Sequence, residues 1–414
     1  MKESNLKPNL LIGATLFALL VALGVSQGLL NRIATAQAQT GVQAPIFEVD
    51  ALWPKPLPNH WLLGSAIGVS VDAQDHVWII HRGAATLANN EKGAMLNPPT
   101  GECCMAAPPI LEFDAAGTLV GHWGGPGQGY EWPQSNHGIT IDHKGNVWIG
   151  GNGQADSHLL KFTKDGKFLM QVGKAGARRT SPAGAEKPSF AGGSNDPESF
   201  GRVAKIWVDP KANEAYIADG YLNKRVAVID ADTGKLKRYW GAYGNKPDDT
   251  NLGNYDPKAP PAQQFRNPVH CADLSNDGFV YVCDRVNDRL QVFTKEGKFV
   301  NEIFLARNTI GSGSVWDVAF SKDPGQRFLY VTDGVNAKVY IVQREPLKLL
   351  TSFGDGGRQP GQFYGAHSIA TDSKGNIYTT ETYEGKRLQK FVYKGMGPVT
   401  RENQGVVWPR SSSE

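Results

Sequence analysis

The sequence is poor in concentrated charge. Its formal net charge is only +3 over 414 residues, and no block of lysine or arginine stands out. Proteins that bind nucleic acids usually carry a basic face or stripe, so we expect no nucleic-acid partner. A glycine-rich loop that could cradle a phosphate group is also lacking, because the glycines lie in turns between apolar stretches. The sequence thus gives no motif for a phosphate-bearing cofactor.

Cysteine is scarce, with four in the chain. Cys271 and Cys283 each lie six residues from Asp277, so a hairpin that turns there would make them cross-strand partners. A disulfide between them would be strained, and it stays an open option. The vicinal pair Cys103 and Cys104 lies in the long segment Gly83–Pro109. The pair could be a redox pair, a soft-metal site or simply part of a covering loop. We favour the covering loop.

The N-terminus has the order of a secretory signal. Lys2 and Lys7 precede an apolar run from Leu10 to Val25, and small residues follow up to Ala38. We therefore predict a signal peptide over residues 1–38, cleaved after Ala38, and an exported protein. The alternative is an uncleaved anchor, since Leu10–Leu30 is just long enough to span a bilayer and tether the protein.

After this segment the chain repeats. An apolar strand, a turn with Asp or Ser, and a second strand with an aromatic residue recur at 68–82, 138–152, 205–220, 271–285, 317–334 and 368–382. Most units continue with a third and a fourth strand. Four strands per unit is the pattern of a β-propeller blade, so we predict an all-β, six-bladed β-propeller over residues 46–395. We expect Phe47–Leu52 to complete the last blade, and 396–414 to be a tail, disordered from Arg401 on.

The segment 267–289 shows the repeat most clearly. Its two strands, Val269–Leu274 and Phe279–Cys283, flank the turn Ser275–Gly278. This hairpin puts His270 where the first strand begins and Arg285 just after the second strand ends. Because the strands are antiparallel, these two residues should meet at one edge of the sheet.

Histidine recurs at the mouth of alternate blades. At the position of His270 the six repeats carry Ile67, His137, Ala204, His270, Trp316 and His367. Alternate blades of a six-fold ring are related by three-fold symmetry, so the three imidazoles should converge on the central channel. Three histidines and a water form the ligand set of an open zinc site. One histidine alone would more often be a hydrogen-bonded wall residue.

The ends of the second strands carry cationic residues on the same face. Arg82 and Arg285 occupy equivalent places in blades one and four, and Tyr221 lies at the corresponding end in blade three. Two arginines beside a metal suit an anionic ligand, most simply a carboxylate. Tyr221 is then a candidate acid or base, with its phenol acidified by the nearby cation. The alternative is that each arginine only pairs with an acid such as Asp284.

These motifs resemble those of peptidyl-α-hydroxyglycine α-amidating lyase, a family of six-bladed propellers with NHL-type repeats. The similarity covers about Trp53 to Val392, and it rests on motifs that keep the family's blades and order. These are His81-Arg82-Gly83, Asn136-His137-Gly138, Asp219-Gly220-Tyr221-Leu222-Asn223-Lys224-Arg225, Pro268-Val269-His270 with Asp284-Arg285, and Ala366-His367.

The resemblance implies a zinc-dependent cleavage of peptidyl-α-hydroxyglycine into a peptide amide and glyoxylate. It implies that His137, His270 and His367 bind zinc and that Arg82 holds the substrate carboxylate. Tyr221 would be the base on the hydroxyl, and Arg285 would stabilise charge near the metal. We thus expect a monomeric carbon–nitrogen lyase whose small-molecule or peptide substrate ends in a carboxylate.

The chain departs from the family at three points. Ser368 replaces an aspartate that helps hold a structural calcium in the family, so a calcium stays an open alternative. Leu222 and Tyr281 stand at two of the family's disulfide positions. The monooxygenase that makes the hydroxyglycine is absent from this chain, which leaves another 2-hydroxy or carboxylate compound open as substrate.

Two other classes of function stay open. One is a non-catalytic NHL-type binding propeller, which would keep the fold without using these side chains for chemistry. The other is a metal-dependent hydrolase or lactonase of small carboxylates. The imidazoles favour zinc over the oxygen ligands that calcium lactonases use.

Overall fold

The computed structural model describes residues 41–182, 185–186 and 189–408. The predicted signal peptide or anchor, residues 1–38, lies outside the described residues. Within them, no helix combines the length and the apolar character needed to cross a membrane.

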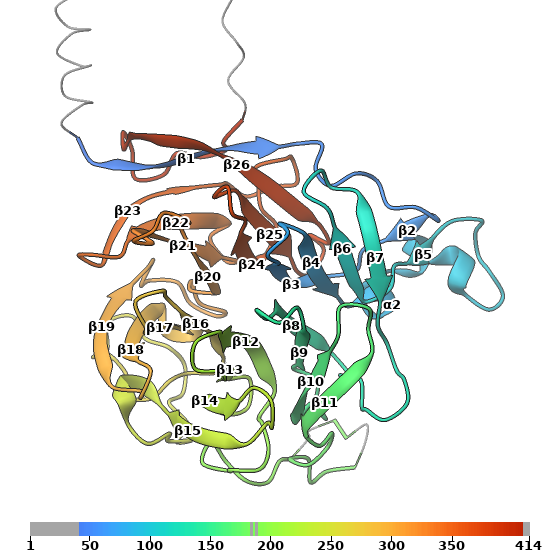
Figure 1. Ribbon diagram of the computed structural model, residues 1–414, viewed down its shortest axis with the longest axis horizontal. Coiled ribbons are helices and arrows are strands. Elements are labelled where there is room, and N and C mark those ends of the chain that lie inside the picture. The colour runs from blue at the N-terminus through green and yellow to red at the C-terminus, as the bar shows by residue number, and fades with distance from the viewer. Residues whose placement is uncertain (1–40, 183–184, 187–188, 409–414) are drawn as a thin grey trace, which may run out of the picture.

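Six four-stranded antiparallel sheets form a closed ring around a central channel (Figure 1). In each blade the innermost strand lies at the channel, and the chain then moves outward. The predicted six-bladed β-propeller is confirmed.

The four strands of each blade follow one another from the channel outward. Blades one to three are β3 (Ala66–Val71), β4 (Val77–His81), β6 (Ile110–Phe113) and β7 (Leu119–Trp123); β8 (Asn136–Ile141), β9 (Val147–Gly151), β10 (His158–Phe162) and β11 (Phe168–Gly173); β12 (Val203–Asp209), β13 (Glu214–Asp219), β14 (Arg225–Asp230) and β15 (Leu236–Trp240). Blades four to six are β16 (Val269–Leu274), β17 (Phe279–Asp284), β18 (Arg289–Thr294) and β19 (Phe299–Phe304); β20 (Asp317–Phe320), β21 (Phe328–Asp333), β22 (Lys338–Gln343) and β23 (Lys348–Phe353); β24 (Ala366–Thr371), β25 (Ile377–Glu381), β26 (Leu388–Pro398) and β1 (Gln43–Asp50).

In blades one, two and six, the turn aspartate and the repeated aromatic residue hold the inner hairpin together. In blade one, Asp72 Oδ1 accepts hydrogen bonds from the backbone N–H groups of Gln74 and His76. Its Oδ2 accepts a hydrogen bond from the buried indole Nε1 of Trp78 at 3.1 Å. One carboxylate therefore closes the turn and satisfies a buried donor. The same arrangement joins Asp142 to Trp148 and Asp372 to Tyr378.

The ring closes through the N-terminal strand β1, as we expected for this part of the chain. β1 pairs antiparallel with β26, and Phe47 lies opposite Tyr393 in the register. The Phe47 ring also packs against Tyr330 and Phe353, with ring centroids 5.3 and 5.5 Å away. A strand from the start of the chain thus completes the last blade and removes its open edge.

The expected disorder of the tail is wrong as far as the structure describes it. β26 runs on to Pro398, and the following segment is held by backbone hydrogen bonds. Ser352 N donates to Glu402 O, and Gly354 N donates to Gly405 O. Val49 N donates to Val407 O. The sequence of this segment has no alternating pattern, and these long-range backbone contacts order it. Residues 409–414 lie outside the described residues.

Both cysteine pairs are bonded. Cys271 faces Cys283 across β16 and β17 and forms a disulfide with an S–S distance of 2.03 Å. Cys103 and Cys104 are bonded to each other in the loop of blade one. That loop contains α2 (Gly83–Thr86) and the 3₁₀ turns η1 (Asn89–Glu91) and η2 (Gly93–Met95). Its β5 (Met105–Ala106) pairs in parallel with β2 (Trp61–Leu62).

Candidate metal centre

The three predicted histidines meet at the mouth of the channel. His137, His270 and His367 are each the second residue of their strand, in β8, β16 and β24. Their ring centroids are 4.8 to 5.0 Å apart, and one nitrogen from each lies within 4.8 Å of the others. All three are at least 96% buried. The structure therefore brings the predicted triad together.

The other three blades fix the orientation of the imidazoles. His137 Nδ1 is 2.6 Å from the carbonyl oxygen of Ala204, and His367 Nδ1 is 2.6 Å from that of Ile67. His270 Nδ1 is 2.5 Å from Trp316 O. Each carbonyl accepts the N–H, so Nδ1 carries the hydrogen and Nε2 keeps its lone pair. The triad thus presents three acceptor nitrogens, oriented as histidine ligands of metals usually are.

Burial and charge keep these imidazoles neutral. Burial lowers the pKa of His137 and His270 well below its usual range, and neighbouring positive groups act in the same direction. Burial, with Arg82 and Arg285, lowers the pKa of His367 to about 3. Metal ligation requires neutral imidazole, so the site has the protonation state that a cation needs.

Contacts of the Tyr221 phenol also fit a cation at this point. Its hydroxyl is 2.8 Å from His137 Nε2 and 3.0 Å from His270 Nε2. A phenol has a single hydrogen and can donate to only one of these two acceptors. The other contact brings two lone pairs together. A metal ion bound by the imidazoles would resolve this conflict, so the residues present fit a metal such as zinc.

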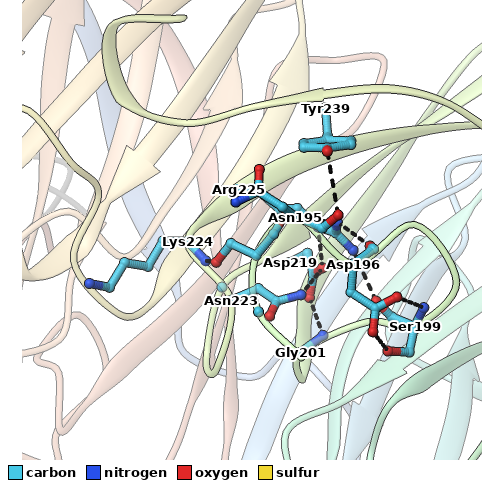
Figure 2. A network of polar contacts seen from close by, with 12 residues as sticks. Asn195, Asp196, Ser199, Gly201, Asp219, Asn223, Lys224, Arg225 and Tyr239 are labelled. Atoms are coloured by element: carbon cyan, nitrogen blue, oxygen red, sulfur yellow. Dashed lines mark hydrogen bonds and ion pairs between the residues drawn. The ribbon is translucent and has the colours of Figure 1, made fainter. Parts of the chain in front are cut away.

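A network of polar contacts around Asp219 supports the loop that follows β13 in blade three (Figure 2). Asp219 accepts from Arg225 Nε at 2.8 Å and from Asn223 Nδ2 at 2.7 Å. Tyr221 follows Gly220, where a Cβ atom would overlap with the backbone of Val269. The loop that carries Tyr221 is therefore held by contacts on both sides. The sequence motif around Tyr221 is explained largely by this support.

Without a metal, the two arginines do not acidify the Tyr221 phenol. Burial raises the pKa of Tyr221, and the opposing effects of Arg285 and Arg82 do not outweigh it. Acidification by a bound metal cation stays a prediction. The sequence could not reveal how deeply this side chain lies.

Arg285 faces the centre with an unused donor. Its guanidinium stacks over the Trp316 ring at 4.4 Å from the centroid, and its NH1 is 3.4 Å from the Tyr221 hydroxyl. Its buried Nε has no hydrogen-bond partner among the described residues. The alternative pairing with Asp284 is not seen, because Asp284 Oδ2 binds Arg289 Nε at 2.8 Å. Arg285 therefore remains able to bind an anion.

Arg82 approaches from blade one and is positioned by blade two. Its Nε donates to Asn136 O at 3.2 Å, and NH2 donates to Asn152 Oδ1 at 2.9 Å. Arg82 and Arg285 both contribute to the electrostatic environment of His367. The structure therefore brings together all six residues predicted for the site.

Sequence reasoning missed Tyr383. It follows Thr382 in blade six as Tyr221 follows Gly220 in blade three, so the repeat alignment contained this signal. Tyr383 is 52% exposed, and it lies near enough to Arg82 and Tyr221 to raise the pKa of both groups. Tyr383 therefore belongs to the rim of the site.

Sequence comparison gives two kinds of relatives. Peptidyl-glycine alpha-amidating monooxygenase B of Xenopus laevis is 28% identical over 255 residues, which are 60% of this chain and 25% of that protein. The NHL repeat-containing protein 3 of Mus musculus is 24% identical over 385 residues, 88% of this chain and 89% of that protein. This chain is therefore similar in sequence to part of the amidating enzymes. The match spans about a quarter of the length of those curated relatives, and no family model matches the chain.

Comparison with solved structures supports the fold. A streptogramin B lyase structure superposes with a TM-score of 0.50 over 85% of this chain and 98% of that chain, at 12% identity. At this identity the likeness shows the propeller architecture alone.

Removing one imidazole should remove the metal and leave the fold. Replacing a hydrogen-bond partner of a metal ligand typically weakens metal binding by about 10- to 100-fold. His270→Ala removes a ligand itself, so we expect it to weaken zinc binding by more than that. Zinc content after dialysis against a weak chelator, together with circular dichroism, measures both effects. His143→Ala, at an exposed turn, is the matched control and should keep its zinc. A His270→Ala protein with stoichiometric zinc would refute the assignment.

Proposed function

We propose that this chain is a zinc-dependent lyase that cleaves the C–N bond of an N-acyl or peptidyl α-hydroxyglycine. The products are an amide and glyoxylate. The observation that carries the proposal is the meeting of three acceptor imidazoles, one phenol and two guanidinium groups at one channel mouth. The homology to the amidating enzymes supports the same reaction type.

Each group has a place in this reaction. His137, His270 and His367 would hold zinc through Nε2. When bound, the ion would supply Lewis acidity that lowers the pKa of the substrate hydroxyl. Arg82, fixed by Asn136 and Asn152, would bind the carboxylate. Arg285, with its free Nε, would stabilise the negative charge that develops beside Tyr221.

Tyr221 would move the proton. As phenolate it accepts the hydroxyl proton, and the O–H electron pair becomes the second bond of the aldehyde. The C–N bond breaks, its electrons pass to nitrogen, and the same proton returns from the phenol to that nitrogen. The reaction is redox-neutral and needs no other co-reactant. Because burial raises the pKa of Tyr221, the arginines and the cation are needed to stabilise the phenolate.

The proposal also covers the location, the oligomeric state and the partner of the protein. We propose an exported protein, monomeric, whose partner is a small molecule or peptide ending in a carboxylate.

A second function is a binding propeller without catalysis. The match to the mouse NHL repeat-containing protein, which covers most of both chains, favours it. The buried Arg285 Nε without a partner among the described residues argues for a ligand in either case. A protein that binds zinc and carboxylates but turns nothing over would support this second function.

Glyoxylate release tests the reaction. The purified protein from about Gln39 on should release glyoxylate from N-benzoyl-α-hydroxyglycine, because the site combines a Lewis acid, a base and a carboxylate clamp. Release should stop with a strong chelator and return with zinc. His143→Ala should match the unchanged protein. A zinc-loaded protein that leaves every α-hydroxyglycine intact would overturn the reaction and leave the metal site standing.

The two predicted roles of Arg82 and Tyr221 separate kinetically. Arg82→Ala should mainly raise KM by about 10- to 100-fold, since charge-assisted hydrogen bonds contribute about 1.5–3 kcal/mol. Tyr221→Phe should mainly lower kcat by about 100-fold or more, because it removes proton transfer. Steady-state kinetics with glyoxylate as the product measures both. Equal and small effects would show that neither side chain touches the substrate.

A further inference from the structure

A buried ion cluster lies on the inner strands, beneath the triad. The Lys205 ammonium in blade three is 2.6 Å from Asp273 Oδ2 in blade four and 2.6 Å from Asp317 Oδ1 in blade five. Both aspartates are almost fully buried. In the sequence these residues are far apart, but Lys205 and Asp317 hold equivalent places in their repeats, directly after Ala204 and Trp316.

The cluster has the chemistry of a cation site. Asp317 Oδ2 accepts a hydrogen bond from the Ser368 hydroxyl at 2.6 Å, and Val318 O is 3.5 Å from the ammonium. Asp273 Oδ1 is buried and has no hydrogen-bond partner among the described residues. Two carboxylates, a carbonyl and a hydroxyl are oxygen ligands that hard divalent cations take. In this channel a lysine side chain lies among them.

The cluster also divides the channel. Lys205 and Asp317 line a small cavity together with the three histidines. Lys205 and Asp273 line the channel that opens on the opposite face. The ion cluster therefore forms the floor of the metal site.

The same cluster is joined to the residues that aim the imidazoles. Lys205 follows Ala204, whose carbonyl accepts from His137, and Asp317 follows Trp316, whose carbonyl accepts from His270. Ser368 follows His367 directly. A cation that holds these strands together therefore holds the hydrogen-bond acceptors of the triad.

We propose that Lys205 is a built-in cation, whose ammonium occupies a second cation position in the channel. It holds β12, β16 and β20 together and leaves the triad as the place in this channel where a divalent ion binds. Removing the ammonium frees two buried carboxylates, which then bind a divalent ion such as calcium.

Metal stoichiometry in Lys205→Met tests this proposal. The methionine keeps an apolar stem of similar length without the charge. After equilibration with calcium, elemental analysis should find one more ion per chain than in the unchanged protein. Saturating calcium should raise the Tm of the variant by several degrees and leave the Tm of the unchanged protein where it was. Adding Asp317→Asn to this variant should abolish the extra ion.

Lys295→Met is the matched control. Lys295 also makes a 2.6 Å ion pair with a buried carboxylate, that of Asp209, at the opposite end of the inner strand. The Lys295→Met variant should gain no ion. If Lys205→Met does not fold, Lys205→Gln is measured with the same expectations. An absent extra ion and an unchanged response to calcium would overturn the proposal. The difference of one ion between Lys205→Met and the unchanged protein tests the proposed role of Lys205. The zinc content of the unchanged protein tests the triad.

Discussion

The site depends on one repeated hydrogen bond, from an imidazole Nδ1 to a backbone carbonyl of the next blade. Three such bonds, at 2.5 to 2.6 Å, cross the boundaries between blades two and three, four and five, and six and one. Each fixes a tautomer and turns Nε2 toward the axis. Even-numbered blades thus supply the three imidazoles, and odd-numbered blades fix their orientation, so the three-fold arrangement requires the closed six-fold ring.

Ring closure is therefore a condition of the geometry of this site. The acceptor for His367 is the carbonyl of Ile67, near the start of the described chain, and β1 completes the blade that carries His367. The tail after β26 adds further bonds to blades five and six. The same backbone pairing thus stabilises the propeller and fixes the geometry of the site.

The repeat predicted the six blades, the hairpin at 269–284 and the meeting of six site residues, because each follows from strand register. What it missed depends on packing. The raised pKa of Tyr221 arises from burial, and the Lys205 cluster joins side chains of three blades. The ordered segment 401–407 arises from backbone contacts with the outer strands of blades five and six. Tyr383 could have been predicted from the sequence, since it occupies the place of Tyr221 in another repeat.

X-ray absorption at the zinc edge of the purified protein tests the central claim most directly. We predict three nitrogen neighbours at about 2.0–2.1 Å with the signature of imidazole, and one oxygen neighbour. That result would match a triad that binds through Nε2 and leaves one position for water or substrate. A shell with sulfur, a shell of oxygen atoms alone, or no bound metal would contradict it.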